Sequence, residues 1–238
     1  MQQVANPSSG RLGAAVLGGI IGAVVMAAIL IFAIPQLAGS RLVRAGMMSD
    51  PQILVDASEA LRDRQYMPVL AQHRAAIETP FGTSWKGSSK PDVVLVEFYD
   101  YACGYCRASN PVLQQLIEED PGLRVVYREL PILGPESVTA ARLSLAASKA
   151  GRFGQFHDAL WAAGKPGPES IARASQSAGI PPNPIESQDI EAELKKNYDL
   201  AGALGATGTP LFVVGNRVLN SAVGYDALKK AIADARAS

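Results

Sequence analysis

Two cysteines separated by two residues are the part of this 238-residue sequence best suited to chemistry. Cys103 and Cys106 are the only cysteines, and they come shortly after the apolar, β-branched run from Val93 to Tyr99. This pattern predicts a strand that delivers a C-x-x-C pair to the start of a helix. A helix N-terminus has unpaired N–H groups and a partial positive charge, so a cysteine there is stabilised as the thiolate, the form that attacks sulfur. The sequence therefore predicts disulfide exchange.

The spacing of the two cysteines predicts a different role for each. Cys103 stands at the edge of the expected helix, where its sulfur can be exposed and charged, so we predict that it is the nucleophile. Cys106 lies one turn further in, on the same face, where it can attack a mixed disulfide and is shielded from outside reagents. The alternatives are an inert disulfide or a zinc site, and a closed zinc site would need both His73 and His157 to converge on the pair. We therefore expect a catalytic dithiol with no metal and no cofactor.

The order of elements in the C-terminal part predicts an α/β fold. The expected elements are a strand at 93–99, a helix at about 103–119, a strand at 123–130, helices at 136–150, 153–163, about 169–178 and 187–204, strands at 211–214 and 217–220, and a helix at 225–237. The first three make a βαβ unit, and the last three a ββα block. The four helices between them form an insert from about 136 to 204.

This order of elements, together with three short motifs, resembles the DsbA-like thiol:disulfide oxidoreductases of the thioredoxin superfamily over about residues 78–237. The motifs are Val-Glu-Phe-Tyr-Asp-Tyr before Cys-Gly-Tyr-Cys, Glu-Leu-Pro-Ile-Leu-Gly at 129–134, and Gly-Thr-Pro-Leu-Phe-Val-Val-Gly at 208–215. The N-terminal segments are most similar to those of the Com1 and copper-sensitivity-suppressor branch, whose better-known members oligomerise through this region. The resemblance implies that residues 78–238 form a thioredoxin domain with a helical insert.

The resemblance also implies a role for Glu97, six residues before Cys103 in an otherwise apolar strand. A carboxylate at this point either faces solvent or is buried under the thiols, where it can take and return the proton of Cys106. The superfamily places an acid here, which favours the second interpretation. Glu97 is therefore expected to be a catalytic residue together with the two cysteines.

Thr209 and Pro210 match the family's cis-proline dipeptide, which lies opposite the C-x-x-C pair. Proline presents no N–H to the neighbouring sulfur, and the backbone of Thr209 is left free to pair with an extended substrate segment. The alternative is that Pro210 merely begins an edge strand. With Gly104 and Tyr105, these two residues form the expected substrate-binding set.

His157 is the histidine closest in character to a catalytic group, because it lies in the aromatic segment 153–161. Its apolar neighbours have the spacing of a helix face that packs into a core. We therefore interpret His157 as a packed, hydrogen-bonded histidine rather than a catalytic one.

An apolar segment near the N-terminus predicts a membrane anchor. Residues 1–11 are polar and expected to be disordered, whereas 12–34 is an uncharged run of 23 residues. As a helix this run is about 34 Å long, against a hydrocarbon core of about 30 Å. It is longer than the apolar region of a cleaved signal peptide, so we favour an uncleaved anchor. The flanking arginines do not settle the orientation, but a dithiol suits an oxidising compartment, which predicts an inner-membrane protein with its catalytic domain in the periplasm.

Residues 50–77 have the pattern of an amphipathic helix. Asp50 and Pro51 are a good cap and first-turn pair, apolar residues follow at helical spacing, and an interruption is expected near Pro68. Such a helix either packs on the catalytic domain or forms a stalk that joins protomers, which would make the protein a homo-oligomer.

The direction of exchange is predicted from small features of the motifs. Gly-Tyr between the cysteines and a threonine before the cis-proline resemble DsbC-type isomerases more than DsbA oxidases. We therefore predict a reductase or isomerase that acts on unfolded or misbridged exported proteins and is served by a membrane redox partner. A DsbA-like oxidase is the first alternative, and a non-enzymatic envelope protein that binds copper(I) through the dithiol is the second. The net charge of zero gives no reason to expect nucleic acid binding.

Overall fold

The computed structural model describes residues 26–27, 34–183 and 187–237, which belong to two compact units divided between Leu61 and Arg62. Helix α2 (Ile34–Ser49) lies in the first unit, and helix α3 (Gln52–Glu78) begins there and ends in the second. Within the described ranges, no helix combines the length and the apolar character that a bilayer crossing requires. The predicted anchor at 12–34 and the predicted disordered segment at 1–11 lie almost entirely outside the described residues.

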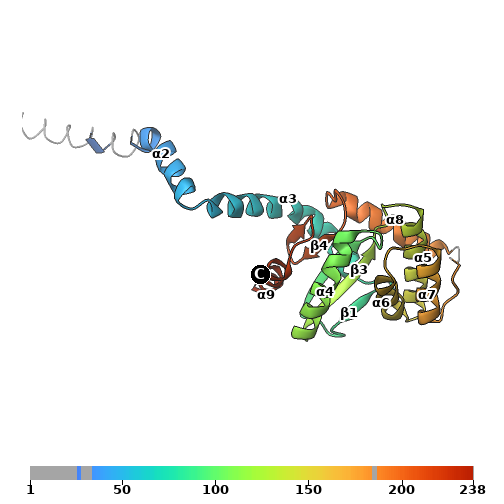
Figure 1. The fold of residues 1–238 in the computed structure, drawn as a ribbon. Helices are drawn as coiled ribbons and strands as arrows, with labels where there is room; N and C mark the ends of the chain where they lie inside the picture. Colours follow the sequence, from blue (N-terminus) through green and yellow to red (C-terminus); the bar gives the residue numbers. More distant parts are fainter. Residues whose placement is uncertain (1–25, 28–33, 184–186, 238) are drawn as a thin grey trace, which may run out of the picture. The chain divides into compact units, whose positions relative to one another are not determined.

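The second unit is built around a five-stranded sheet (Figure 1). Its strands are β1 (Trp85–Gly87), β2 (Val93–Tyr99), β3 (Leu123–Glu129), β4 (Leu211–Val214) and β5 (Arg217–Leu219), in the spatial order β1-β3-β2-β4-β5. Strands β2 and β3 are parallel, and the other neighbours are antiparallel. Helix α4 (Gly104–Glu119) makes the crossover between β2 and β3. The expected βαβ unit and ββα block are therefore confirmed.

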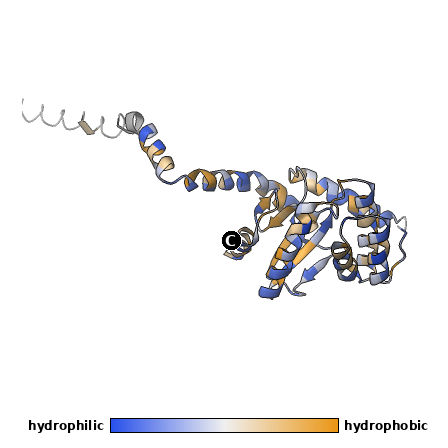
Figure 2. Ribbon diagram, viewed as in Figure 1, coloured by the Kyte–Doolittle hydropathy of each residue, from blue (hydrophilic) through white to orange (hydrophobic). Residues whose placement is uncertain are grey.

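Helices cover both faces of this sheet, which explains why β2, β3 and β4 are buried along almost their whole length. Side chains alternate across a strand, so Leu95 and Tyr99 of β2 pack with α4, the insert and α9 (Tyr225–Ala237). Val96 and Phe98 point the other way and pack with the second half of α3 and with α8. Figure 2 shows hydrophobic strands between helices of mixed hydropathy. Glu97 has the same parity as Leu95, so its position in the sequence assigns it to the α4 face.

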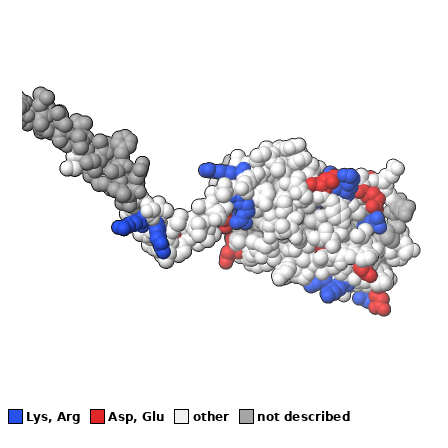
Figure 3. Space-filling view, turned by 90° about the horizontal axis from the view of Figure 1, so that it is seen from above, with Lys and Arg blue, Asp and Glu red and all other residues white. Residues whose placement is uncertain are grey.

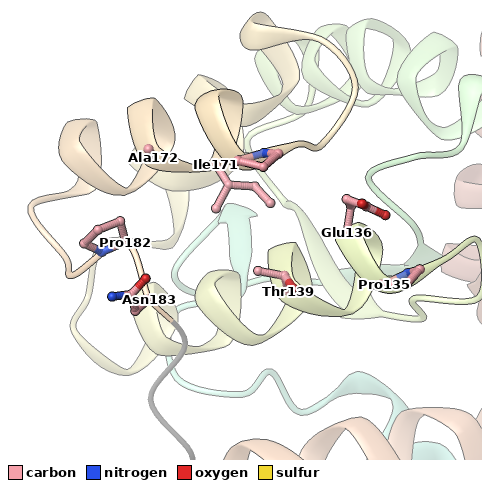
Figure 4. Close-up of a pocket in the computed structure, with 8 residues that line it drawn as sticks. Pro135, Glu136, Thr139, Ile171, Ala172, Pro182 and Asn183 are labelled. Carbon is pink, nitrogen blue, oxygen red and sulfur yellow. The ribbon is translucent and has the colours of Figure 1, made fainter.

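The insert consists of α5 (Pro135–Lys149), α6 (Phe153–Ala163), α7 (Pro168–Ala178) and α8 (Gln188–Ala203), close to the predicted bounds. Figure 1 shows α5, α6 and α7 gathered at the end of the domain away from α9. A cleft of about 390 Å³ is lined by the first turns of α5 and α7, where Thr139 lies across from Ile171 (Figure 4). On the face in Figure 3, acidic and basic side chains of the second unit lie interspersed, as expected for a chain of zero net charge.

Helix α3 continues through Pro68, where an interruption was expected, and its second half belongs to the second unit. Packing explains this continuity, because Leu70 and Ile77 are buried in the core on the sheet face opposite α4. A helix that buries these side chains gains more from packing than it loses from one missing N–H.

The C-terminus of α3 is held by the buried side chain of Arg128 in β3. Its guanidinium donates hydrogen bonds to the backbone oxygens of Ile77 at 2.8 Å and Thr79 at 2.5 Å, and also to that of Ala76. It also forms an ion pair with Glu193 of α8 at 2.7 Å. The last carbonyls of a helix lack partners within the helix, so one arginine satisfies several of them and connects α3 to the insert.

Candidate active site

Cys103 and Cys106 lie where the sequence predicts, at the N-terminus of α4. Cys103 is the N-cap residue, and its N–H donates a hydrogen bond to the carbonyl oxygen of Asp100 at 3.0 Å. Cys106 lies in the first turn and is 1% exposed. Cys103 is only 6% exposed, less than predicted, because the backbone at Thr209 covers it. Both thiols are unbridged in the structure, which is therefore the dithiol form.

The Thr209–Pro210 peptide bond is cis, as the resemblance implies. It brings the carbonyl oxygen of Thr209 to 3.2 Å from the sulfur of Cys103, 106 residues away in the sequence. Pro210 precedes β4, which lies inside the sheet between β2 and β5, so it does not begin an edge strand. The two cysteines and the Thr209–Pro210 dipeptide therefore form one site.

A cleft of about 370 Å³ opens beside this site. It is lined by Tyr105, Thr207, Gly208, Thr209, Pro210, Asn220, Ser221 and Ala222. Tyr105 is 70% exposed and forms one side of the cleft, while Gly104 has no atom near the position a Cβ would take. The segment 220–222 is a part of the site that sequence reasoning missed, because only the pairing of β4 with β5 brings it beside the cis-proline.

Glu97 is buried on the α4 face, which excludes the solvent-facing alternative. It is 3% exposed, and its Oε1 has no hydrogen-bond partner among the described residues. Its neighbours in the sheet are Tyr127 of β3 and Phe212 of β4. Burial, and secondly the charge of Cys103, raises the pKa of Glu97 to about 8.

The thiol of Cys106 is subject to the same two effects. Burial is the main cause that raises its pKa far above the ordinary value, and the negative charge of Glu97 is the second. A charge on either group therefore disfavours a charge on the other. The two buried groups therefore favour a state in which at most one of them is charged, as expected for a pair that shares a proton.

Asp100 is a second residue of the site that sequence reasoning missed. Its buried carboxylate accepts a hydrogen bond from the N–H of Ala102 at 2.8 Å, and others from Ile132 at 2.8 Å and Leu133 at 2.9 Å. One side chain thus fixes both the turn before Cys103 and the loop after β3. An aspartate often accepts a hydrogen bond from the backbone N–H two residues later, so the bond to Ala102 could have been predicted from the sequence. The bonds to residues 132 and 133 could not, because they join segments that are distant in the sequence. Ile132 and Leu133 are exposed apolar residues on the loop that Asp100 holds.

His157 is fully buried, as predicted for a packed histidine. Its Nε2 accepts a hydrogen bond from the indole N–H of Trp161 at 3.0 Å, and its Nδ1 lies 3.2 Å from the hydroxyl of Tyr101. His73 lies in α3 and is not part of the site. The interpretation of His157 as a core residue is therefore confirmed.

A dithiol at the start of the crossover helix, facing a cis-proline, together with this strand order, defines a protein of the thioredoxin fold with a redox-type C-x-x-C site. The helical insert between β3 and β4 narrows the class further. The chain belongs to the family of DSBA-like thioredoxin domains, whose model matches residues 94–233. Cys103 and Cys106 are the C-x-x-C pair of this DSBA-like thioredoxin domain.

Solved structures of similar proteins agree with this assignment. A thioredoxin-like oxidoreductase from Silicibacter pomeroyi DSS-3 is 35% identical, with a TM-score of 0.65 over 69% of this chain and 98% of that one. A linker-deletion and N6K mutant of ScsC from Proteus mirabilis is 29% identical, with a TM-score of 0.67 over 85% of this chain and 95% of that one. A periplasmic thioredoxin-like protein from Salmonella enterica serovar Typhimurium is 29% identical, with a TM-score of 0.63 over 69% and 96%. The resemblance to the copper-sensitivity-suppressor branch is therefore confirmed.

Curated relatives include a protein of a different kind. The Na(+)/H(+) antiporter NhaA 3 of Salinispora tropica is 26% identical over 160 residues, which is 64% of this chain and 24% of that protein. The chain thus spans about a quarter of the length of the curated relatives it matches.

Proposed function

We propose that this chain is a membrane-tethered periplasmic reductase or isomerase of disulfides in exported proteins. The observation that carries the proposal is the position of Cys103, with its sulfur 3.2 Å from the Thr209 carbonyl and Cys106 buried behind it. An extended substrate that pairs with the backbone of Thr209 would have its disulfide beside this sulfur. Gly104 and Tyr105 between the cysteines, and the threonine before the cis-proline, favour the reducing or isomerising direction.

The exchange takes place in two balanced steps. The Cys103 thiolate attacks one sulfur of a substrate disulfide, the substrate S–S bond breaks, and the second substrate sulfur leaves as a thiolate. In the mixed disulfide Cys103 carries no charge, so its contribution to the raised pKa of Glu97 is removed and the Glu97 carboxylate can take the proton of Cys106. Cys106 then attacks Cys103, which releases the first substrate sulfur as a thiolate and leaves a Cys103–Cys106 disulfide. The substrate gains two electrons and the dithiol loses two. For isomerisation, a substrate thiolate instead attacks the mixed disulfide and returns Cys103 unchanged.

The direction of exchange is tested with the purified chain and two substrates. We expect reduction of insulin in the presence of a dithiol donor and recovery of activity from scrambled ribonuclease. Rapid oxidation of reduced ribonuclease, with neither of these activities, would identify an oxidase. Stoichiometric copper(I) uptake without any exchange would support the envelope copper-binding alternative. Cys106→Ala should accumulate a mixed disulfide through Cys103, and Cys103→Ala is the matched control that should form none.

We also propose that the first unit mediates homo-oligomerisation. Large apolar side chains are exposed along it, namely Leu42, Val43, Met47, Met48, Ile53, Leu54, Val55 and Leu61. A pocket of about 560 Å³ between α2 and the start of α3 is lined mainly by such residues, including Met47 and Leu54. Isolated helices with this much exposed apolar surface are best explained by an unseen partner, and a second copy is the simplest one.

Oligomerisation is tested by deleting residues 34–61, which leaves the buried second half of α3 intact. The full chain should sediment as an oligomer and the shortened chain as a monomer. Isomerase activity should fall with the deletion, while insulin reduction should persist. Equal sedimentation per chain for both proteins would refute the assembly, whatever their activity.

The orientation is tested by labelling. Glu169 has a side chain that is 93% exposed, so Glu169→Cys in a background of Cys103→Ala and Cys106→Ala offers one accessible thiol. A membrane-impermeant maleimide should label it in intact spheroplasts. Labelling only after lysis would place the domain on the cytoplasmic side.

A further inference from the structure

The two walls of the cleft beside the cis-proline come from segments that are distant in the sequence. One wall belongs to the connection between α8 and β4, at residues 207–210, and the other is the segment 220–222 that follows β5. In the antiparallel pairing of β4 with β5, Phe212 lies opposite Leu219, so the continued register places 220–222 opposite 209–211. The register therefore explains why the second wall lies beside the cis-proline.

A tyrosine of α3 lies close to both walls. The hydroxyl of Tyr66 accepts a hydrogen bond from the side-chain Nδ2 of Asn220 at 3.1 Å. The same hydroxyl lies 3.4 Å from the position that a Cβ at Gly205 would take, and Gly205 follows the last residue of the α8 cap. Tyr66 is partly buried and packs, as Ala206 does, against the core on the sheet face opposite α4. One side chain of α3 therefore lies beside the start of one wall and is hydrogen-bonded to the first residue of the other.

The side-chain amide of Asn220 keeps unused hydrogen-bonding capacity after this contact. An asparagine amide has two N–H donors and an acceptor oxygen, and the bond to Tyr66 uses one N–H. Its Oδ1 is buried and has no partner among the described residues, whereas the residue as a whole is partly exposed and lines the cleft. Turning the amide by 180° would pair Oδ1 with the hydroxyl and would leave both N–H groups in its place. In either orientation, Tyr66 engages one end of the amide and leaves the other.

A peptide group is the ligand chemistry that matches this amide. Both carry one carbonyl oxygen and N–H donors, so hydrogen bonds between them require no particular side chain on the ligand. The eight residues that line the cleft are all uncharged, which gives an anion or a cation no reason to bind there. The backbone of Thr209 lies in the opposite wall, where an extended segment can pair with it. The cleft is therefore suited to polypeptide backbone.

We propose that Asn220 binds the backbone of the substrate polypeptide in this cleft and that Tyr66 is a positioning residue that holds the Asn220 amide in place. The inference rests on the proposed function, because the ligand is taken to be an extended segment that pairs with Thr209. Asn220 hydrogen-bonds to a peptide group of this segment from the other wall. Backbone contacts on both sides bind a chain whatever its sequence, which suits an enzyme that acts on many exported proteins.

Nuclear magnetic resonance tests the contact without any exchange step. The protein is the Cys103→Ser, Cys106→Ser variant labelled with ¹⁵N, and the probe is reduced, carboxymethylated ribonuclease, an unfolded polypeptide without free thiols. Adding the probe should shift the side-chain N–H resonances of Asn220, which are assigned by their loss in Asn220→Asp. Unchanged Asn220 resonances would overturn the proposal, whichever direction of exchange the wild type shows.

Kinetics test whether the contact serves the substrate. The reduced protein is mixed with a peptide that contains a disulfide and, separately, with bis(2-hydroxyethyl) disulfide, which has no peptide group. The quantity of interest is the ratio of the two second-order rate constants. Asn220→Ala should lower this ratio about tenfold, which corresponds to about 1.4 kcal/mol, because only the peptide loses a hydrogen bond. A general distortion of the site would lower both rate constants and leave the ratio unchanged, and that result would overturn the proposal.

The positioning role of Tyr66 is tested by the same ratio. Tyr66→Phe keeps the ring beside Gly205 and removes only the hydroxyl, so the ratio should fall about threefold. Tyr225→Phe is the matched control, because it removes a hydroxyl that is hydrogen-bonded to Glu119 outside the cleft, and its ratio should equal that of the wild type. Equal ratios in the two variants would overturn the role of Tyr66. The ratio compares two substrates of one dithiol, so it is independent of whether the protein works as a reductase, an isomerase or an oxidase.

Discussion

Replacement of Glu97 by glutamine should stabilise the reduced protein relative to the wild type, and this difference should grow as the pH rises. In the unfolded chain this carboxyl titrates near 4.5, whereas in the folded dithiol form burial and the Cys103 charge raise its pKa to about 8. Between these two values the folded state holds a proton that the unfolded state has released. The free energy of unfolding of the wild type must therefore fall as the pH rises from 4.5 to about 8, because the stabilisation from the bound proton of Glu97 is lost.

The magnitude follows from the width of the window. Each pKa unit corresponds to about 1.4 kcal/mol, and two and a half units separate 4.5 from neutral pH. The stability of Glu97→Gln relative to the wild type should thus increase by about 3 kcal/mol between pH 4.5 and pH 7, and by about 5 kcal/mol above pH 8. This is a large share of the 5–15 kcal/mol that stabilises a typical domain. His157 titrates in both proteins, so its contribution cancels from the difference.

The assay is urea unfolding of both reduced proteins across this pH range, followed by tryptophan fluorescence. The disulfide forms are the matched control, because they lack the Cys103 charge and should show a smaller dependence on pH. A stability difference that stays constant with pH would refute the assignment of Glu97 as a buried, unpartnered acid.

Glu97→Gln should also slow the release of substrate from the mixed disulfide.

Two pairs of substitutions test how the domain is held together. Arg128→Ala removes the buried partner of Glu193, which keeps only its ion pair with the more exposed Lys196, and should cost about 3–5 kcal/mol in urea unfolding. Arg142→Ala, which breaks a half-exposed ion pair, should cost under about 1 kcal/mol. Gly87→Ala should cost more than Gly151→Ala, although both have positive φ, because a Cβ at position 87 would lie 2.4 Å from a carbonyl oxygen and one at 151 would meet nothing within 4 Å. Equal losses within either pair would contradict the packing described here.

The central elements were predictable because their signals are local. Strand β2 and helix α4 follow the predicted ranges to within a residue, since an apolar β-branched run and a helix start border the C-x-x-C pair. The insert helices are bounded by glycines and prolines and were also found within about a residue or two. The order of these elements, with the motifs at 129–134 and 208–215, was enough to predict the thioredoxin fold.

The features that were missed depend on contacts between distant segments. The continuity of α3 through Pro68 results from the burial of Leu70 and Ile77 and from the hydrogen bonds of Arg128, none of which leaves a local signal. The short strand β1 was not among the expected elements, because three residues give no reliable period. Residues 220–222 likewise line the cleft only in the folded chain, and Asp100 accepts hydrogen bonds from the N–H groups of residues 132 and 133 only there.

Two glutamates lie on the α4 face of the central strands, and their environments differ. Glu97 has an oxygen without a hydrogen-bond partner among the described residues next to the dithiol, and burial and then the charge of Cys103 raise its pKa to about 8. Glu129 lies at the end of the next strand, where its carboxyl group accepts a hydrogen bond from the hydroxyl of Tyr99. A polar group buried without a partner is costly, whereas one that is hydrogen-bonded is better accommodated. Of the two, Glu97 is therefore the residue that we propose as the proton carrier, because a change of charge at Cys103 alters its pKa directly.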